Sequence, residues 1–292
     1  SSSVPAKEVI FMFPITSHEQ LAPKVHRMTV KAPVVAEKAK PGQFVIVIID
    51  EKGERVPFTI SGWDTAAGTV EFVYIEVGNT TRQLASLKPG DQLAHFVGPL
   101  GMAAEVDAFG HVVAVVSGYG IAAMVPILNA YREKGNRITT ILQSPDRERV
   151  FGRSEIEAVS DRVILAVGEN GEDMATSTTR PLRKLLGNLV HDPVHRVVVM
   201  GSICLMRVIS ELTRPFGIKT VVHLTPLMVD GTGMCGACRL SVKGSNRFAC
   251  VHGPEFDGHE VDGWEVLMAR RCTYADESVH QQGFQCRGCS QW

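Results

Sequence analysis

Four side chains of the kinds that bind metals lie close together near the C-terminal end of the chain: Asp230, Cys235, Cys238 and Cys250. Their spacing is D-x₄-C-x₂-C-x₁₁-C. Plant-type [2Fe–2S] loops have the spacing C-x₄-C-x₂-C followed by a distant fourth cysteine, so Asp230 occupies the first ligand position of that pattern. We therefore predict that these four residues bind a [2Fe–2S] cluster.

The glycines of the same segment, Gly231, Gly233 and Gly236, help to decide between an iron–sulfur cluster and zinc. They would let the backbone wrap around a cluster and direct N–H groups at its sulfides. A Cys₃Asp zinc site is the chemical alternative, and His252 is the nearby histidine that could complete a common zinc ligand set. Zinc does not need this density of glycine, so the iron–sulfur interpretation is favoured.

The seven cysteines are distributed unevenly, because none precedes Cys204 and the other six follow residue 234. An odd number of cysteines, in a chain large enough to hold itself together by burial, does not indicate a disulfide framework. Cys272, Cys286 and Cys289 lie in a polar, irregular tail at residues 271–292. Cys286 and Cys289 could form a dithiol or half of a metal site, or could belong to a flexible end.

A cation and two hydroxyls lie in one predicted strand segment, Arg55-Val56-Pro57-Phe58-Thr59-Ile60-Ser61. A second strand leads through Glu76-Val77-Gly78-Asn79-Thr80-Thr81 into a predicted helix. A helix N-terminus gathers unpaired N–H donors that suit a phosphate, and an arginine can hold the same pyrophosphate bidentately. Taken singly, these features also fit a helix cap and a surface charge.

Two glycine turns follow predicted strands further along the chain. Gly118, Gly120, Ile121 and Ala122 lie between a strand and a helix, where a diphosphate can approach the backbone. The third glycine of a full G-x-G-x-x-G pattern is missing, so turns that serve packing alone are the alternative. The second turn contains Gly201, Cys204 and Met206. Cys204 either contacts the nicotinamide or flavin, or is a small buried apolar side chain.

The elements that must position these residues differ between the two halves of the chain. The first hundred residues alternate between apolar and polar types, with turns such as Lys40-Pro41-Gly42 between them. This pattern predicts a small, closed six-stranded antiparallel barrel with one helix near Asn79–Ser86. The strands are expected near Val9–Ile15, Val25–Lys31, Phe44–Asp50, Val56–Ser61, Val70–Val77 and Gln92–Val97.

From His111 onward, buried β-branched runs alternate with helical patterns, which predicts a doubly wound five-stranded parallel sheet. The runs are Val112–Val116, Ile138–Leu142, Val163–Val167, Val197–Met200 and Lys219–Leu224, with helices near Ile121–Lys134, Ser154–Val159, Thr178–Val190 and Ser202–Arg214. The predicted domains are the barrel at residues 1–107, the nucleotide domain at 108–224, the cluster region at 225–270 and the tail at 271–292.

Composition limits the class of protein. Thirty basic against 31 acidic side chains argue against a nucleic-acid or anionic-membrane partner. The N-terminus lacks the layout of a secretory signal. The apolar stretch Val112–Leu128 is interrupted by Ser117, Gly118 and Pro126 and is short for a bilayer. We expect a cytoplasmic protein without a membrane span.

The segments Arg55–Ser61 and Glu76–Thr81 together resemble those of the ferredoxin–NADP reductase superfamily, in which a flavin barrel precedes a nicotinamide domain. The resemblance implies that Arg55 binds the FAD pyrophosphate and that Thr59 or Ser61 lies near flavin N5, as the catalytic residues. It implies further cofactor contacts for Pro57, Phe58, Tyr74, Glu76, Gly78, Thr80 and Thr81. In that superfamily the Gly118 and Gly201 turns serve the nicotinamide cofactor, and Gly98-Pro99-Leu100-Gly101 leaves the barrel.

The segments MVDGTGMCGACRLSV and FACVHGPEFDGHEVD are similar to those of a narrower family, the small subunits of NADH-dependent ferredoxin:NADP oxidoreductases. In that family an aspartate and three cysteines hold a [2Fe–2S] cluster. The resemblance implies that NADH exchanges a hydride with FAD. It also implies that the cluster relays single electrons to a large flavin and [4Fe–4S] subunit, in electron bifurcation with ferredoxin and NADP.

Other functions stay open at this point. One is the electron-input subunit of a dihydroorotate dehydrogenase, whose relatives keep four cysteines, or of a multi-subunit hydrogenase. A second, of another class, is a non-catalytic, zinc-stabilised assembly module that has lost its flavin. NADH is favoured over NADPH, although Ser144, Arg147 and Arg149 could hold a 2′-phosphate.

Overall fold

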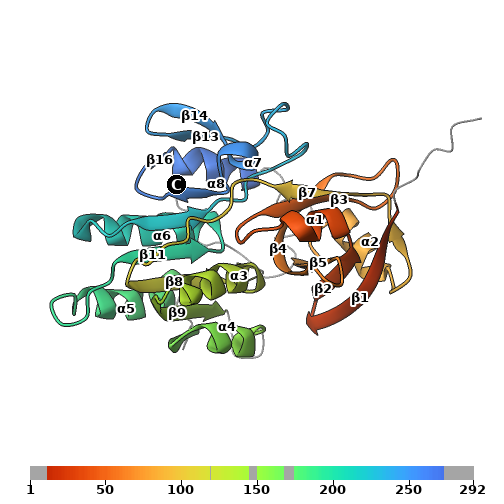
Figure 1. Cartoon of the computed structure of the whole chain (residues 1–292). Helices are drawn as coiled ribbons and strands as arrows, with labels where there is room; N and C mark the ends of the chain where they lie inside the picture. The colour runs from red at the N-terminus through yellow and green to blue at the C-terminus, as the bar shows by residue number, and fades with distance from the viewer. Residues whose placement is uncertain (1–11, 119, 145–149, 168–173, 273–292) are drawn as a thin grey trace, which may run out of the picture.

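Antiparallel strands of the N-terminal half form a closed barrel in the computed structural model, which describes residues 12–118, 120–144, 150–167 and 174–272 (Figure 1). The strand order is β6-β1-β2-β5-β4-β3-β7. Its two ends, β6 and β7, follow each other in the chain, so the sheet closes on itself. The strands are β1 (Phe13–Ala22), β2 (Val25–Lys31), β3 (Phe44–Ile48), β4 (Val56–Asp64), β5 (Thr69–Ile75), β6 (Gln92–Leu93) and β7 (His95–Leu100).

The barrel confirms the predicted architecture but has seven strands instead of six. The predicted strand at Gln92–Val97 divides at Ala94, whose N–H donates to the carbonyl of Ile49 at 3.1 Å. This bond lets the segment leave β1 and pair with β3. The first strand begins at Phe13, later than predicted, and residues 1–11 lie outside the described part of the chain.

Two helices accompany the barrel. Helix α2 (Asn79–Ser86) has the predicted bounds, whereas α1 (Pro33–Lys38) was not predicted. Proline at the first helical position suits α1, because that position needs no N–H donor. The barrel core contains the aromatic residues Phe58, Phe72 and Tyr74, with the Phe58 and Phe72 rings stacked 4.7 Å apart.

The C-terminal half confirms the doubly wound parallel sheet. Its order is β10-β9-β8-β11-β12-β15, and the first five strands are parallel. They are β8 (His111–Ser117), β9 (Arg137–Ser144), β10 (Arg162–Val167), β11 (Arg196–Met200) and β12 (Thr220–His223). The connecting helices are α3 (Gly120–Glu133), α4 (Arg153–Val159), α5 (Met174–Leu186) and α6 (Ile203–Thr213), which continues into the 3₁₀ helix η1 (Arg214–Phe216).

Successive residues of the parallel strands bury opposite faces. Val112, Ala114 and Val116 pack toward α3 and α4, whereas Val113 and Val115 pack toward α5 and α6. The chain order changes direction between β8 and β11, so the carboxyl ends of these two strands form the switch point of the sheet. Ligands of doubly wound sheets bind outside such a point.

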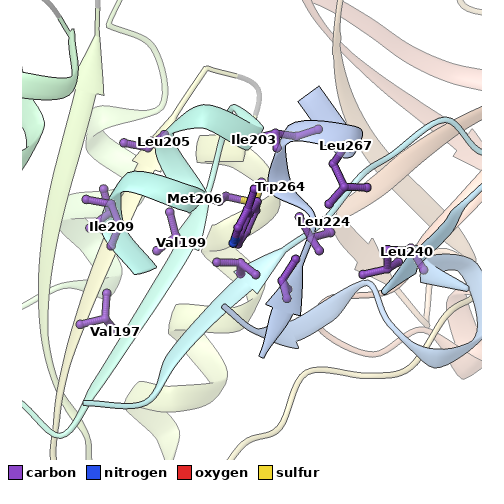
Figure 2. Packing of buried hydrophobic residues seen from close by; sticks show 14 of the residues in the cluster. Val197, Val199, Ile203, Leu205, Met206, Ile209, Leu224, Leu240, Trp264 and Leu267 are labelled. Carbon is purple, nitrogen blue, oxygen red and sulfur yellow. The ribbon is translucent and has the colours of Figure 1, made fainter. Parts of the chain in front are cut away.

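The region after residue 224 adds a strand and a helix to the parallel sheet. Its elements are β13 (Arg239–Val242), β14 (Ser245–Phe248), α7 (Ala249–His252), β15 (Glu255–Asp257), β16 (Val261–Asp262) and α8 (Trp264–Cys272). Strand β15 pairs antiparallel with β12. Trp264 of α8 packs among the α6 residues Ile203 and Met206 and the β11 residue Val199 (Figure 2). The cluster region thus shares the core of the nucleotide sheet.

The linker between barrel and sheet is held by polar contacts. The N–H of Met102 donates to the carbonyl of Gly253 at 2.6 Å. The Glu105 carboxylate accepts from buried Arg196 at 2.7 Å and from Lys219 at 3.0 Å. The Arg196 guanidinium also lies 3.9 Å from the centre of the Phe109 ring. No helix in the described ranges is long and apolar enough to cross a membrane.

His223, at the end of β12, predicts a pH-dependent stability. It is buried, and neither ring nitrogen has a hydrogen-bond partner among the described residues. Burial lowers its pKa from 6.5 to about 4, so the folded protein binds fewer protons than the unfolded chain. The unfolding free energy that depends on a neutral His223 is therefore fully present above about pH 6.5. On the order of 3 kcal/mol of it is lost as the pH falls toward 4.

Urea unfolding between pH 4.5 and 7.5 measures this dependence. His223→Phe should remove part of the fall in unfolding free energy, whereas His95→Gln, at an exposed histidine, should leave it intact. An identical pH dependence in all three proteins would contradict the prediction.

Candidate functional site

The segment of residues 225–253, which contains the four predicted cluster ligands and is called the cluster loop below, is held by hydrogen bonds to Asp230. Its Oδ1 accepts from the N–H of Thr232 at 2.9 Å, and its Oδ2 accepts from the N–H of Cys235 at 2.7 Å. These backbone hydrogen bonds lower the pKa of the Asp230 carboxyl below its usual value, because they favour the charged form. The carboxylate therefore shapes the turn that carries Cys235.

Two of the three predicted cysteine ligands lie together. The Sγ atoms of Cys238 and Cys250 are 3.1 Å apart, both side chains are buried, and no disulfide joins them. Burial and this contact raise the pKa of Cys250 to about 12. Cys235 is exposed. Within the described ranges, no three His, Cys, Asp or Glu side chains are grouped as a complete metal site.

The donor set nevertheless suits an iron–sulfur cluster. The Cys238 and Cys250 thiols are adjacent, and the other two predicted ligands, Cys235 and Asp230, are joined by the bond from the Cys235 N–H to the Asp230 carboxylate. Gly231 and Gly236 have φ values of +74° and +70°, in the region that side chains disfavour. A Cβ on Gly231 would approach Leu100 Cδ1 to 2.8 Å, so the loop packs directly on the barrel.

A cavity of about 610 Å³ lies between the cluster loop and the outer face of the barrel. The barrel contributes Ile46, Ile48 and Val97 as apolar wall and Arg55 and His95 as polar wall. The cluster loop contributes Asp230, Thr232, Met234 and Cys235. Arg55, predicted to bind the flavin pyrophosphate, and two predicted cluster ligands therefore line one cavity.

Successive residues of β4 and β5 point to opposite faces of the sheet, which separates the predicted flavin residues into two groups. Phe58 and Tyr74 lie in the barrel core, so these two predicted cofactor contacts are placed as packing residues. Pro57 and Thr59 alternate with Phe58 and lie half-buried on the other side of the strand. Ser61 is buried, and its hydroxyl donates to Glu71 at 3.2 Å.

Sequence reasoning missed the polar surroundings of Tyr74. The Tyr74 hydroxyl lies 3.1 Å from His18 Nε2, and this nitrogen lies 3.2 Å from His26 Nδ1. His26 Nε2 lies 2.7 Å from Glu76, the predicted flavin residue that follows β5. Burial raises the pKa of Tyr74 well above its usual value, so its hydroxyl keeps its proton. His26 lies two residues before Met28 and four before Val30 in β2, so it lies on the same side of the strand as these apolar residues. This spacing was the signal for its inward position.

The start of α2 contains the remaining predicted phosphate residues. Gly78 precedes the helix, and a Cβ placed on it would meet nothing within 4 Å, so the space beside the turn is open. The Thr81 hydroxyl accepts from the N–H groups of Val77 and Gly78, both at 2.9 Å. The Thr80 hydroxyl donates to Glu54 at 2.5 Å. Glu54 was not predicted as a site residue.

The two glycine turns meet at the switch point of the parallel sheet. A Cβ on Gly120 would lie 2.8 Å from Met200 Cγ, and one on Gly201 would lie 2.2 Å from Ser117 Oγ. Beside Gly118, whose φ is +57°, the space is open. The structure thus brings the two turns together, with an open position at the carboxyl end of β8.

Other predicted nucleotide residues lie deeper. Ile121, Ala122 and Met206 are buried in the hydrophobic cores on either side of the sheet. Cys204 is half-buried in the first turn of α6. Arg147 and Arg149, considered for a 2′-phosphate, lie outside the described residues, as do Cys286 and Cys289.

Comparisons with known proteins agree with this arrangement. The family model described as the iron–sulfur cluster binding domain of dihydroorotate dehydrogenase B matches residues 225–262. A Thermotoga maritima protein described as a homolog of the dihydroorotate dehydrogenase B (NAD(+)) electron transfer subunit is 38% identical over 263 residues. That match covers 90% of this chain and 92% of the relative.

Solved structures give the same result. A chain of the NADH-dependent reduced ferredoxin–NADP oxidoreductase, solved in a study of flavin-based electron bifurcation, is 35% identical, with a TM-score of 0.81. The match covers 93% of this chain and 98% of that one. A Neisseria gonorrhoeae ferredoxin–NADP⁺ reductase with bound FAD and NADP, 18% identical, has a TM-score of 0.54 and shares the fold over 71% of this chain and 91% of its own.

Fold and site define an oxidoreductase subunit built on a ferredoxin–NADP⁺ reductase fold with an added iron–sulfur domain. The chain belongs to the family of dihydroorotate dehydrogenase B electron transfer subunits and their homologs, which are subunits of flavin and iron–sulfur oxidoreductases.

The contact between the glycine turns predicts the effect of one added methyl group. In Gly201→Ala, the new Cβ would overlap Ser117 Oγ, so we expect a loss of about 1–3 kcal/mol in unfolding free energy. Removing that oxygen in Gly201→Ala/Ser117→Ala should recover part of the loss, because the nearest Ser117 atom is then Cβ at 3.4 Å. Urea unfolding of the two variants and of Ser117→Ala completes the cycle; strictly additive effects would contradict the proposed contact.

Proposed function

We propose that this chain transfers electrons between NADH and a partner subunit, through FAD at the barrel (residues 1–107) and a [2Fe–2S] cluster at residues 225–270. The nicotinamide cofactor binds at residues 108–224. The observation that carries the proposal is the shared cavity, which Arg55, Asp230 and Cys235 all line. A flavin held by Arg55 and a cluster held by the loop would be close neighbours.

The two bound groups supply different chemistry: FAD exchanges a hydride with nicotinamide and passes on single electrons, and the cluster carries one electron at a time. The chain itself binds and orients them. Arg55 offers a forked guanidinium to the flavin diphosphate, and the first turn of α2 offers free backbone N–H groups. Thr59, half-buried on the outer side of β4, is the hydroxyl best placed near the flavin, since Ser61 is bonded to Glu71.

The glycine turns hold the nicotinamide cofactor. Gly118 leaves open space after β8, and the first turn of α3 presents its N–H groups there, so a diphosphate can approach the backbone. Gly120 and Gly201 keep the β8 and β11 turns in contact, which fixes the edge of the sheet on which the cofactor lies. The apolar barrel residues Ile46, Ile48 and Val97 limit water on the cluster side of the flavin.

The partner subunit binds around the cluster loop. Two large apolar side chains that do not line the cavity are exposed here: Leu227 at 46% and Val229 at 42%. Exposed apolar groups gathered around a redox centre indicate a protein interface. A large flavin and [4Fe–4S] subunit, with ferredoxin and NADP as its substrates in electron bifurcation, is the partner that we propose. The 35% identity to the ferredoxin–NADP oxidoreductase chain supports it.

A dihydroorotate dehydrogenase partner is the second candidate. The 38% identical Thermotoga maritima relative and the family model for residues 225–262 favour it. Asp230 favours the bifurcating assignment instead, because relatives of the dihydroorotate dehydrogenase subunit keep four cysteines. Co-purification of the native complex distinguishes the two, since the partner either carries [4Fe–4S] clusters and reduces ferredoxin or oxidises dihydroorotate.

Two variants of Asp230 test whether it is a cluster ligand or only a loop support. Asp230→Cys supplies a thiolate but loses the bonds to Thr232 and Cys235, whereas Asp230→Asn keeps an accepting oxygen but is a poor ligand. If Asp230 is a ligand, the Cys variant keeps its iron and its cluster potential falls by tens of millivolts, roughly. The Asn variant then loses most of its iron.

Iron analysis, the visible spectrum and redox titration measure these outcomes. The reverse pattern, with full iron in Asp230→Asn and little in Asp230→Cys, would assign Asp230 to loop support alone. Cys238→Ala is the control that should abolish the iron–sulfur absorption in either case.

A variant of Arg55 tests the flavin assignment. Arg55→Gln removes a charge-assisted bidentate contact, so the dissociation constant for FAD should rise about 10- to 100-fold. Lys52→Gln removes a charge from the same exposed loop and should change the constant little. Fluorescence quenching of FAD by flavin-depleted protein gives both constants, and equal effects of the two variants would argue against a role for Arg55.

A further inference from the structure

Arg239 directly follows the predicted ligand Cys238, at the start of β13. Its N–H donates to the carbonyl of Gly236 at 3.2 Å, so residues 236–239 form a tight turn that contains this ligand. The side chain lies against the start of the same turn, because a Cβ built on Gly236 would lie 3.3 Å from Arg239 Nη2. A guanidinium therefore lies beside the backbone that joins Cys235 to Cys238.

Contacts on both sides hold Arg239 in this place. Strand pairing puts it directly opposite Phe248 of β14, and its guanidinium lies 5.6 Å from the centre of the Phe248 ring, within the range of a cation–π contact. The Arg239 carbonyl accepts from Arg270 of α8 at 2.6 Å. Gly236, which has a φ of +70° and no Cβ, leaves the guanidinium room to lie close to the turn.

Two other basic groups of the cluster region add no net charge to it. Lys243 forms an ion pair with Glu260 at 2.6 Å. The His252 ring stacks on that of Phe248, and its Nδ1 accepts the Phe248 N–H at 2.9 Å. A ring nitrogen that accepts carries no proton, so this contact holds a neutral imidazole. Arg239, by contrast, forms no ion pair with any residue in the described ranges.

One carboxylate lies near Arg239 without cancelling its charge. Asp262 lines a small cavity of about 150 Å³ together with Arg239 and Arg270. Its Oδ2 accepts from the Ser241 hydroxyl at 3.0 Å and from the Gly244 N–H at 2.6 Å. Two arginines and one acid leave this edge of the cluster region with a net positive charge.

We propose that Arg239 raises the reduction potential of the [2Fe–2S] cluster by electrostatic stabilisation of its reduced state. The inference rests on the proposed binding of the cluster by Asp230, Cys235, Cys238 and Cys250. One electron, lost by the reduced flavin, turns one Fe(III) of the cluster into Fe(II) and makes the cluster more negative by one charge. A cation beside the ligand turn stabilises that added charge, and net charge is one of the factors that set the potentials of such clusters.

The exposure of Arg239 limits the size of the effect, because water weakens the attraction between its charge and the cluster. Removing the charge should therefore lower the ratio of reduced to oxidised cluster, at a fixed solution potential, about three- to tenfold. For a one-electron couple this change lowers the midpoint potential by about 28–59 mV.

Redox titration of the full-length chain, followed by the electron paramagnetic resonance signal of the reduced cluster, tests the proposal. Arg239→Gln removes the charge and should show the full fall in midpoint potential. Arg239→Lys keeps the charge and should keep most of the wild-type potential. Added salt should shrink the difference between wild type and Arg239→Gln, since it screens exposed charges.

Arg247→Gln is the matched control. It removes the same charge from the same hairpin, but Arg247 precedes Phe248 in β14 and so points to the opposite face of the strand. Its midpoint potential should equal that of wild type. An unchanged midpoint in Arg239→Gln, or an equal fall in Arg239→Gln and Arg247→Gln, would overturn the proposal.

Iron analysis of each variant separates an effect on potential from an effect on folding. Arg239→Leu is a second neutral variant, and loss of iron from both Arg239→Gln and Arg239→Leu would assign Arg239 to loop structure and would also overturn the proposal. A wild-type chain without an iron–sulfur signal would instead contradict the proposed function.

Discussion

The pairing of β15 with β12 fixes the position of the cluster loop, on which the arrangement of the site depends. Three residues, Glu255–Asp257, extend the parallel sheet antiparallel to β12. The N–H of Leu224 donates to the carbonyl of Pro254 at 2.8 Å, and that of Gly258 to the carbonyl of Thr220 at 2.7 Å. The bond between Leu224 and Pro254 joins the two ends of the segment between residues 225 and 253. Both ends are therefore held at the edge of the parallel sheet formed by β12 and β15. The loop packs on the barrel at Gly231, beside Leu100 and Ile46.

One hydrophobic core contains residues from three parts of the chain that were predicted as separate domains. This core includes Val197 of the nucleotide sheet, Cys250 and Trp264 of the cluster region, and Phe44 and Ile46 from the outer face of β3. The barrel interior forms a separate core around Phe72. Loosening the cluster region therefore disturbs the nucleotide sheet more than the barrel interior, since it shares its buried surface with the former.

The sequence predicted both sheets because their signals are local: alternation with turn residues in the barrel, and buried β-branched runs in the parallel sheet. Strand β15 gave no such signal, since three residues carry no periodicity and the pairing is made with a distant strand. The position of Phe58 and Tyr74 in the barrel core was not predicted, for a related reason. Which face a strand residue occupies depends on its register with neighbours, and β4 and β5 carry apolar residues on both faces. The hydrogen bond between Thr80 and Glu54 spans 26 positions, which no spacing rule predicts.

The hydrogen bonds of Asp230 also give a physical reason why an oxygen ligand would suit a position that thiolates usually occupy. A carboxylate has two oxygens with about four lone pairs, so it can accept the N–H groups of Thr232 and Cys235 and still offer a lone pair to a metal. A thiolate is a weak acceptor and cannot do both equally well. The loop needs this support, because Gly231 and Gly236 adopt positive φ and contribute no side-chain contacts of their own. The aspartate therefore orders the turn around Cys235, and as the proposed ligand it would affect the cluster structurally as well as electronically.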